Sequence, residues 1–302
     1  MTLDELLGQL FDFSNYGQLL VLVQNSIIAA AVLGIVGGLI GVFVMQRDMA
    51  FAVHGISELS FAGAAGALLL GANVVAGSLV GSLIAAAIIG LLGARARDRN
   101  SIIGVLMPFG LGLGLLFLAL YPGRSGNKFG LLTGQIISVN IPQLGLLIGI
   151  SILVLAVLLF IWRPLTFDSL DSEVAAARGV PTRGLSFTFM VLLGLTVAVS
   201  VQIIGALLVL ALLVTPAAAA LRLSSSPVLV PVLSMLFGLV SAVGGILLAI
   251  GGSLPISPYI TTISFLIYVV ARIIGTAKSR TRRRRGGSPA GRVPSTPIMV
   301  GE

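Results

Sequence analysis

The stretch Arg47–Gly63, RDMAFAVHGISELSFAG, places two ionisable side chains inside an otherwise apolar run. His54, the only histidine of the chain, is followed four residues later by Glu58. Positions i and i+4 of an α-helix share a face, so the imidazole and the carboxylate point the same way. If the helix begins near Arg47, Glu58 lies about 16 Å along it, near the middle of a hydrocarbon core about 30 Å thick. Ionisable groups at that depth usually face a pathway or a partner rather than lipid.

The composition places the chain in a membrane. Of its 302 residues, 57% are hydrophobic and only 9% are charged, whereas an average soluble domain has about 25% charged residues. So few charges cannot cover a water-facing surface, and the 38 glycines suit helices that pack closely within a bilayer. We therefore predict an all-α, polytopic transmembrane helical bundle.

Several kinds of chemistry are excluded by what the sequence lacks. It has no cysteine, which excludes disulfides and thiolate metal sites. It has no glycine-rich phosphate loop followed by lysine, so the chain does not hydrolyse nucleotide itself, and we expect no enzyme activity. The net charge of +8 comes largely from residues 272–292, beyond the last apolar run. This position indicates a basic anchor beside anionic lipid rather than a nucleic-acid site.

Apolar runs long enough to cross a bilayer follow one another along the chain. We expect nine, or eight if the segment that begins near Gly205 is broken or re-entrant. The expected runs are 19–45, 51–70, 74–93, 101–120, 143–162, 184–203, 205–221, 228–250 and 258–276. This pattern divides the chain into an N-terminal lead-in at 1–18, a transmembrane domain at 19–276 and a basic, disordered cytoplasmic tail at 277–302.

The arginines predict the orientation, because cytoplasmic loops of membrane proteins carry an excess of Lys and Arg. The loop 94–100 (ARARDRN) contains three arginines and is therefore placed inside. Alternation from this loop puts the N-terminus outside and the C-terminus in the cytoplasm. The outer segments then hold only Arg124 and Lys128 as basic residues.

Two loops are longer than a turn requires. On the outer side, 121–142 keeps a short apolar piece that predicts a re-entrant or interfacial helix. On the cytoplasmic side, 164–183 predicts a short helix at about 168–180, with EVAAAR as its body, Gly179 near its C-terminus and Pro181 beyond it. Its N-cap candidates are Asp168, Ser169, Asp171 and Ser172. A small helix carried on a cytoplasmic loop is typical of a docking feature.

Three interpretations of His54 and Glu58 remain open from the residues alone. The pair could form interhelical hydrogen bonds that satisfy each side chain within the bundle. It could supply an imidazole and a carboxylate to a divalent transition metal, a ligand combination that suits zinc, manganese or iron(II). It could also relay protons, although no other carboxylate within an apolar run continues such a chain.

Three blocks of the sequence resemble the permease subunits of ATP-binding-cassette importers for manganese, zinc and iron. The blocks are 41–63, 171–185 and 196–222, and their order and spacing agree with the family over about 20–275. The resemblance implies a type II ABC-importer-like permease domain at 19–276. It also implies that the short cytoplasmic helix couples to an ATPase, through the docking residues Asp171, Glu173, Ala176, Arg178 and Gly179.

The resemblance assigns the metal-pathway role to His54 and Glu58, with one departure. The family usually has aspartate, then histidine four residues on, then Pro-Gly. An ungapped alignment places His54 on the aspartate, Glu58 on the histidine and Ala62-Gly63 on Pro-Gly. The order of the ligand types is therefore inverted, whereas one imidazole and one carboxylate are kept at the same spacing.

The function that the resemblance implies is ATP-driven import of divalent transition-metal ions by alternating access. Two permease copies would form a homodimer around the pathway, and cytoplasmic ABC ATPase subunits would drive it. An extracytoplasmic solute-binding lipoprotein would deliver zinc, manganese or iron as the transported ion, with no permanently bound cofactor. The expected location is the bacterial plasma (inner) membrane. The alternatives are a proton-coupled secondary transporter that uses His54 and Glu58 as a titrating pair, and a membrane scaffold without transport.

Overall fold

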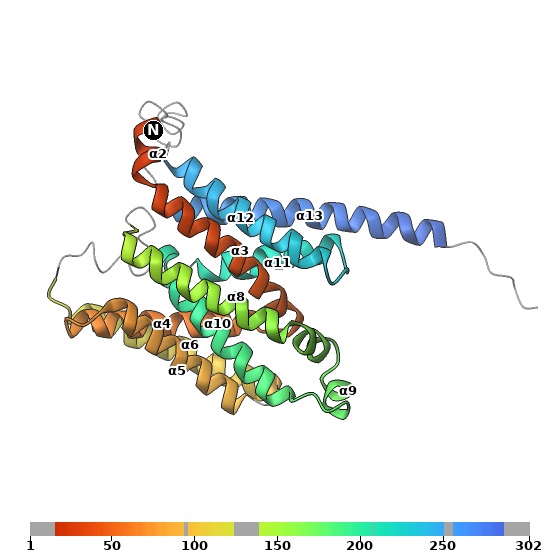
Figure 1. Ribbon diagram of the computed structural model, residues 1–302, viewed down its shortest axis with the longest axis horizontal. Coiled ribbons are helices and arrows are strands. Elements are labelled where there is room, and N and C mark those ends of the chain that lie inside the picture. The colour runs from red at the N-terminus through yellow and green to blue at the C-terminus, as the bar shows by residue number, and fades with distance from the viewer. Residues whose placement is uncertain (1–15, 94–95, 124–138, 207, 251–255, 287–302) are drawn as a thin grey trace, which may run out of the picture.

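The described part of the chain is built from α-helices. The structure, a computed structural model, describes residues 16–93, 96–123, 139–206, 208–250 and 256–286. Its helices, shown in Figure 1, are α2 (Tyr16–Leu22), α3 (Gln24–Gln46), α4 (Ala50–Leu69), α5 (Val74–Leu92), α6 (Ala96–Leu120), α8 (Ile141–Leu170), α9 (Ser172–Ala177), α10 (Thr182–Ile204), α11 (Val209–Leu223), α12 (Leu229–Ala249) and α13 (Ile256–Gly286).

Eight of the described helices are long and apolar enough to cross a membrane: α3, α4, α5, α6, α8, α10, α12 and α13. The fold class is therefore confirmed as a polytopic helical bundle. The segment expected at 205–221 forms the 15-residue helix α11 instead of a full span. Gly205, which has a φ of +82°, ends α10 just before it. At about 1.5 Å per residue, α11 is about 22 Å long, which is shorter than the hydrocarbon core.

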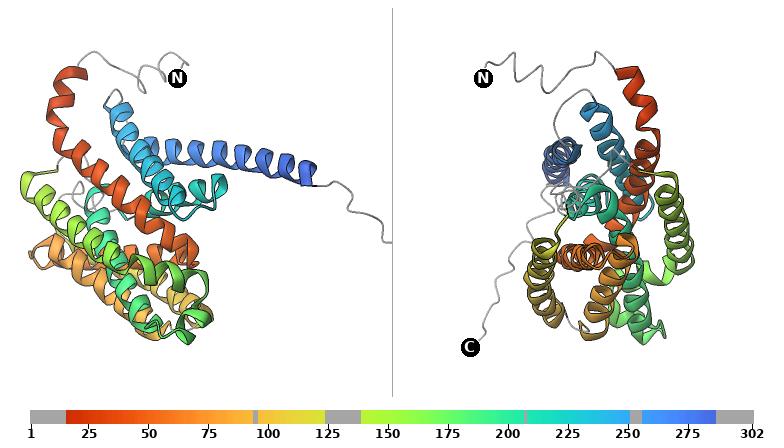
Figure 2. Two further views of the ribbon diagram at one scale, coloured as in Figure 1. Left: turned by 45° about the vertical axis from the view of Figure 1, so that its right-hand side comes forward. Right: turned by 90° about the vertical axis from the view of Figure 1, so that its left-hand side faces the viewer.

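Three helices form the interior of the bundle. In the most apolar part of α3, α4 and α10, 72% of the residues are buried, against 17% to 39% in the other five long helices. Figures 1 and 2 show α4, α5 and α6 on one side and α11, α12 and α13 on the other, with α3 between them. The most extensive contacts join α4 to α5 and α6, and α3 to α12. The helix that carries His54 and Glu58 is thus held from several sides.

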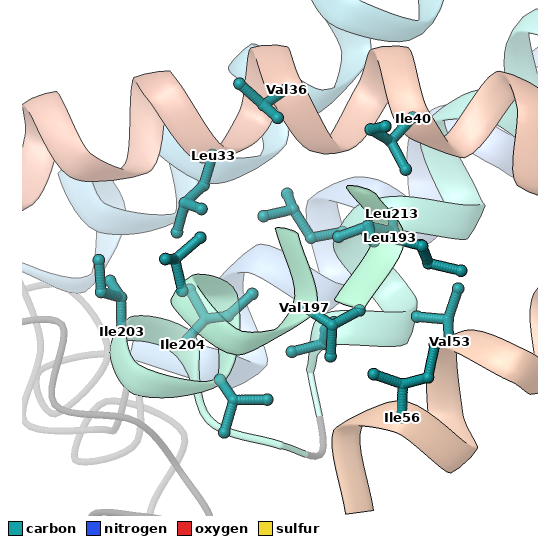
Figure 3. Close-up of a cluster of buried hydrophobic side chains, with 14 of the residues drawn as sticks. Leu33, Val36, Ile40, Val53, Ile56, Leu193, Val197, Ile203, Ile204 and Leu213 are labelled. Carbon is teal, nitrogen blue, oxygen red and sulfur yellow. The ribbon is translucent and has the colours of Figure 1, made fainter. Parts of the chain in front are cut away.

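A cluster of buried aliphatic side chains fixes the position of α4. Figure 3 shows Val53 and Ile56 of α4 beside Val197 of α10, with Leu213 of α11 and Ile40 of α3 above them. All five side chains are fully buried. Because Val53 and Ile56 point into this core, the neighbouring His54 points to a different face of the helix.

The connection between α3 and α4 is only three residues long. The amide of Met49 donates to the carbonyl oxygen of Val44 at 2.8 Å and closes the turn. Asp48 has a φ of +52°, a left-handed conformation that Asp tolerates better than most residues because its short side chain can bond locally. This tight turn fixes where α4 begins relative to the end of α3.

The structure changes two predicted boundaries. The cytoplasmic helix expected at about 168–180 is shorter: α8 continues to Leu170, and α9 occupies only Ser172–Ala177. The tail expected to be disordered from 277 is helical to Gly286, because its Arg-rich sequence propagates α13. The predicted helix in the loop 121–142 falls mostly on 124–138, outside the described residues, as does most of the lead-in at 1–18.

Contact between α4 and α5 depends on glycine. A Cβ atom added at Gly63 of α4 would collide with the carbonyl oxygen of Gly77 in α5, whereas one added at Gly149 of α8 would meet nothing within 4 Å. We therefore expect Gly63→Ala to destabilise the bundle by about 1–3 kcal/mol, since backbone must shift to make room. Gly149→Ala is the matched control. Thermal unfolding of the purified variants measures the difference, and equal melting temperatures would contradict the expectation.

Candidate metal pathway and the Arg47 cluster

His54 and Glu58 lie together on α4, as their spacing predicts. The Nε2 atom of His54 is 3.5 Å from Oε1 of Glu58. The other polar atoms of the pair, Nδ1 of His54 and Oε2 of Glu58, are buried without a hydrogen-bond partner among the described residues. Buried polar atoms are normally paired because an unpaired one costs about 1–3 kcal/mol. These unpaired atoms do not support the interpretation in which the pair is satisfied by interhelical hydrogen bonds.

The face of α4 that carries the pair is open at one end and closed at the other. Phe51, His54 and Glu58 follow one another at helical spacing, so their side chains share this face. Phe51 is 67% exposed, the His54 side chain is 28% exposed, and the Glu58 side chain is 3% exposed. The imidazole is therefore reached from the surface of a single chain, and the carboxylate lies behind it at a depth of about 12 Å along the helix.

A metal ion held by this pair would need further ligands. The described residues contain no group of three or more His, Cys, Asp or Glu side chains that could hold a metal ion together. Transition metals take four to six ligands, and imidazole with carboxylate is a suitable part of such a set. The geometry fits a site that supplies only some of the ligands of an ion in transit. This site lies on the partly exposed face of α4.

The predicted docking residues form one short, capped element. Asp171 is the N-cap of α9, and its Oδ1 accepts from the amides of Glu173 and Val174 at 3.1 and 3.0 Å. Gly179 has a φ of +82° just beyond the helix, as expected of a C-terminal glycine. Ala176 is exposed, whereas Ala175 is fully buried. The structure thus presents one face of α9 outward and anchors the other.

Asp168 has a role that its predicted N-cap position did not indicate. It lies in the last turn of α8, and its Oδ2 forms an ion pair with Nη1 of Arg47 at 2.6 Å. The side chains are 1% and 10% exposed, so the pair is buried. Its other oxygen, Oδ1, accepts from the hydroxyl of Ser172 in α9 at 2.9 Å. Removing one partner of such a buried pair costs about 3–5 kcal/mol.

Arg47 joins several helices at this end of the bundle. Its Nη2 donates to the hydroxyl of Ser186 in α10, and its guanidinium lies 5.8 Å from the ring centre of Phe189, within the range of a cation–π contact. Its carbonyl oxygen accepts from Nη2 of Arg99 in α6 at 3.1 Å. We call Arg47, Arg99, Asp168, Ser172 and Ser186 the Arg47 cluster. In the sequence, Arg47 marked only the expected start of the helix that carries His54, because a partner 121 residues away leaves no local signal.

The fold and site define a class of protein: a multi-pass membrane protein with a histidine and a glutamate paired inside the bundle and a small helix held outside it. The chain belongs to the ABC 3 transport family, whose model matches residues 20–275. This confirms the resemblance seen in the sequence. Membership of this family does not favour the proton-coupled secondary transporter, which needs no ABC ATPase.

Known proteins similar to the chain include manganese transport proteins. It is 31% identical to the manganese transport system membrane protein MntC of Halalkalibacterium halodurans, over 74% of this chain and 77% of that protein. It is 27% identical to the manganese import system permease protein ScaB of Streptococcus parasanguinis, over 86% and 92%. Among solved structures, PsaBC from Streptococcus pneumoniae in complex with Fab matches with a TM-score of 0.80 and 26% identity, over 90% of this chain and 99% of that chain.

Proposed function

We propose that the chain is the membrane-spanning permease subunit of an ATP-driven importer of divalent transition-metal ions, working by alternating access. The observation that carries the proposal is the pair of His54 and Glu58 on α4, within a chain of the ABC 3 transport family. We assign these two residues to the metal pathway and the transmembrane domain at 19–276 to the permease. The chain itself is a transport subunit, and a separate partner hydrolyses ATP.

The open face of α4 supports a pathway shared by two copies. Phe51 is exposed and His54 is partly exposed on the same face that leads to Glu58. A second chain against this face would cover Phe51 and bring another imidazole and carboxylate to the pathway, so four side chains would replace two. We therefore propose a homodimer, since one copy offers too few ligands for a transition metal.

We propose manganese as the first ion to test. The relatives MntC and ScaB are named for manganese, and a carboxylate beside an imidazole is a combination that manganese accepts. Zinc and iron accept the same two ligands, so the comparison among the three metals must be made directly.

The end of the bundle that carries Arg47 and Arg99 supports a proposal for where the remaining partners bind. Arg47 follows α3 and Arg99 lies near the start of α6, and the two meet at the end of the bundle that carries α9, which supports a single cytoplasmic face under the positive-inside rule. We propose that ATPase subunits dock on α9 there, through Asp171, Glu173, Ala176, Arg178 and Gly179. An extracytoplasmic solute-binding protein would deliver the ion on the opposite face of a bacterial plasma membrane, with the N-terminus outside and the C-terminus inside.

Metal uptake tests the proposal. Cells that lack their own importer should receive this chain, with its partner ATPase and binding-protein genes supplied or withheld, and be assayed with manganese, zinc and iron in parallel. We expect uptake of manganese only when the ATPase is present. Uptake that persists without an ATPase would overturn the proposal in favour of a secondary carrier. No uptake of any of the metals by an inserted, assembled complex would remove the metal assignment.

A further inference from the structure

We infer that the ion pair of Arg47 and Asp168 is a positioning device that links the ATPase-docking helix α9 to the metal-pathway helix α4. Neither residue touches the transported ion: both lie at the end of the bundle beside α9. Their role is to make the position of α4 depend on the position of α9. The inference rests on the proposed function, because it concerns how an ATPase movement reaches the metal pair.

The first half of the link joins α9 to Arg47. Ser172, the first residue of α9, donates to Oδ1 of Asp168 at 2.9 Å. The second oxygen of the same carboxylate accepts from Nη1 of Arg47 at 2.6 Å. One carboxylate therefore holds both the docking helix and Arg47, and a displacement of α9 acts on Arg47 through a charge-assisted contact rather than through flexible loop.

The second half joins Arg47 to α4. Arg47 caps the end of α3, and only Asp48 and Met49 separate it from the first residue of α4. The amide of Met49 is bonded to the carbonyl oxygen of Val44, so this turn has little freedom to absorb a movement. His54 follows little more than one turn after the start of α4. A shift of the Arg47 guanidinium is thus transmitted to the beginning of the helix that carries the metal pair.

The surroundings of Arg47 make the link stiff. Ser186 and Phe189 of α10 hold the guanidinium from a second direction. Arg99 of α6 donates to the Arg47 carbonyl oxygen at 3.1 Å and holds the turn from a third. Coupling between distant sites needs a contiguous element whose arrangement both sites influence. The Arg47 cluster is contiguous with α9 on one side and with α4 on the other.

The test separates coupling from stability by measuring metal transported per ATP hydrolysed. The assembled complex should be purified, reconstituted in vesicles with its binding protein, and compared as wild type, Ser172→Ala and Asp168→Asn. Ser172→Ala removes one hydrogen bond, and we expect the transport-to-hydrolysis ratio to fall about three- to tenfold. Asp168→Asn breaks the buried ion pair, and we expect a fall of about tenfold or more. ATP hydrolysis continues in both variants.

Two controls keep the inference falsifiable. Ser172→Thr keeps the hydroxyl and should retain the wild-type ratio. Thr166→Ala removes a hydroxyl of α8 that donates only to the Trp162 carbonyl oxygen, at 2.8 Å, and should also retain it. The inference would be overturned if Ser172→Ala left the transport-to-hydrolysis ratio unchanged. It would also be overturned if transport and hydrolysis fell by the same factor because less complex assembled. Either result would leave ATP-driven transport by the wild-type protein, and so the proposed function, intact.

Discussion

Glu58→Gln is expected to lower metal uptake by about 100-fold or more while the protein still inserts and assembles. Glutamine has nearly the same size and shape as glutamate, so packing around this 3% exposed side chain is preserved. The substitution removes the negative charge that attracts a divalent ion. Changing even a residue that only supports a metal ligand costs about 10–100-fold, and Glu58 is proposed to contact the ion itself.

The measurement is uptake of manganese by cells that express equal amounts of each variant. Ser57→Ala on the same helix is the control, because the Ser57 hydroxyl donates to the His54 carbonyl oxygen at 2.8 Å within its own helix. We expect the control to transport at close to the wild-type rate. Wild-type uptake by Glu58→Gln would remove Glu58 from the mechanism and leave the pathway to be sought elsewhere.

Ala176→Asp is expected to release the ATPase and stop transport without unfolding the chain. Ala176 is exposed on α9, whereas its neighbour Ala175 is fully buried, so the new carboxylate would face the proposed partner and not the bundle. A desolvated, unpaired charge at a docking surface is strongly unfavourable, and a change at a central contact weakens binding by about 30-fold or more.

Co-purification of the ATPase with the tagged permease measures this effect. The control is Ser225→Asp, which adds the same charge to an exposed position in the connection between α11 and α12. ATPase that remains bound to Ala176→Asp as it does to wild type would contradict the docking assignment. This outcome differs from that expected for Asp168→Asn, in which the ATPase stays bound and only coupling is lost.

Much of the fold could be predicted because a bilayer imposes a length on each helix. The runs expected at 51–70 and 74–93 correspond to α4 at Ala50–Leu69 and α5 at Val74–Leu92. The juxtaposition of His54 and Glu58 followed from helical periodicity, which needs no tertiary information. Asp171 and Gly179 could likewise be placed near the ends of a helix, since capping chemistry is local.

The features that escaped prediction depend on contacts between distant segments. Asp168 had the residue type and position of an N-cap, yet α8 continues past it to Leu170 and its carboxylate pairs with Arg47 across the bundle. The tail beyond 277 had the composition of a disordered segment, yet its arginines are good helix formers and extend α13 to Gly286. Composition describes an isolated segment and cannot include what the preceding helix nucleates.

The glycine contact between α4 and α5 has a mechanical consequence. Where Gly63 meets Gly77, the two helices touch through backbone, and one turn away the hydroxyls of Ser60 and Ser78 are hydrogen-bonded across the same contact at 2.7 Å. Interlocked side chains must change rotamers before one helix can move along another, and close packing makes such changes costly. We therefore expect α4, which carries His54 and Glu58, to move together with α5 rather than to slide along it.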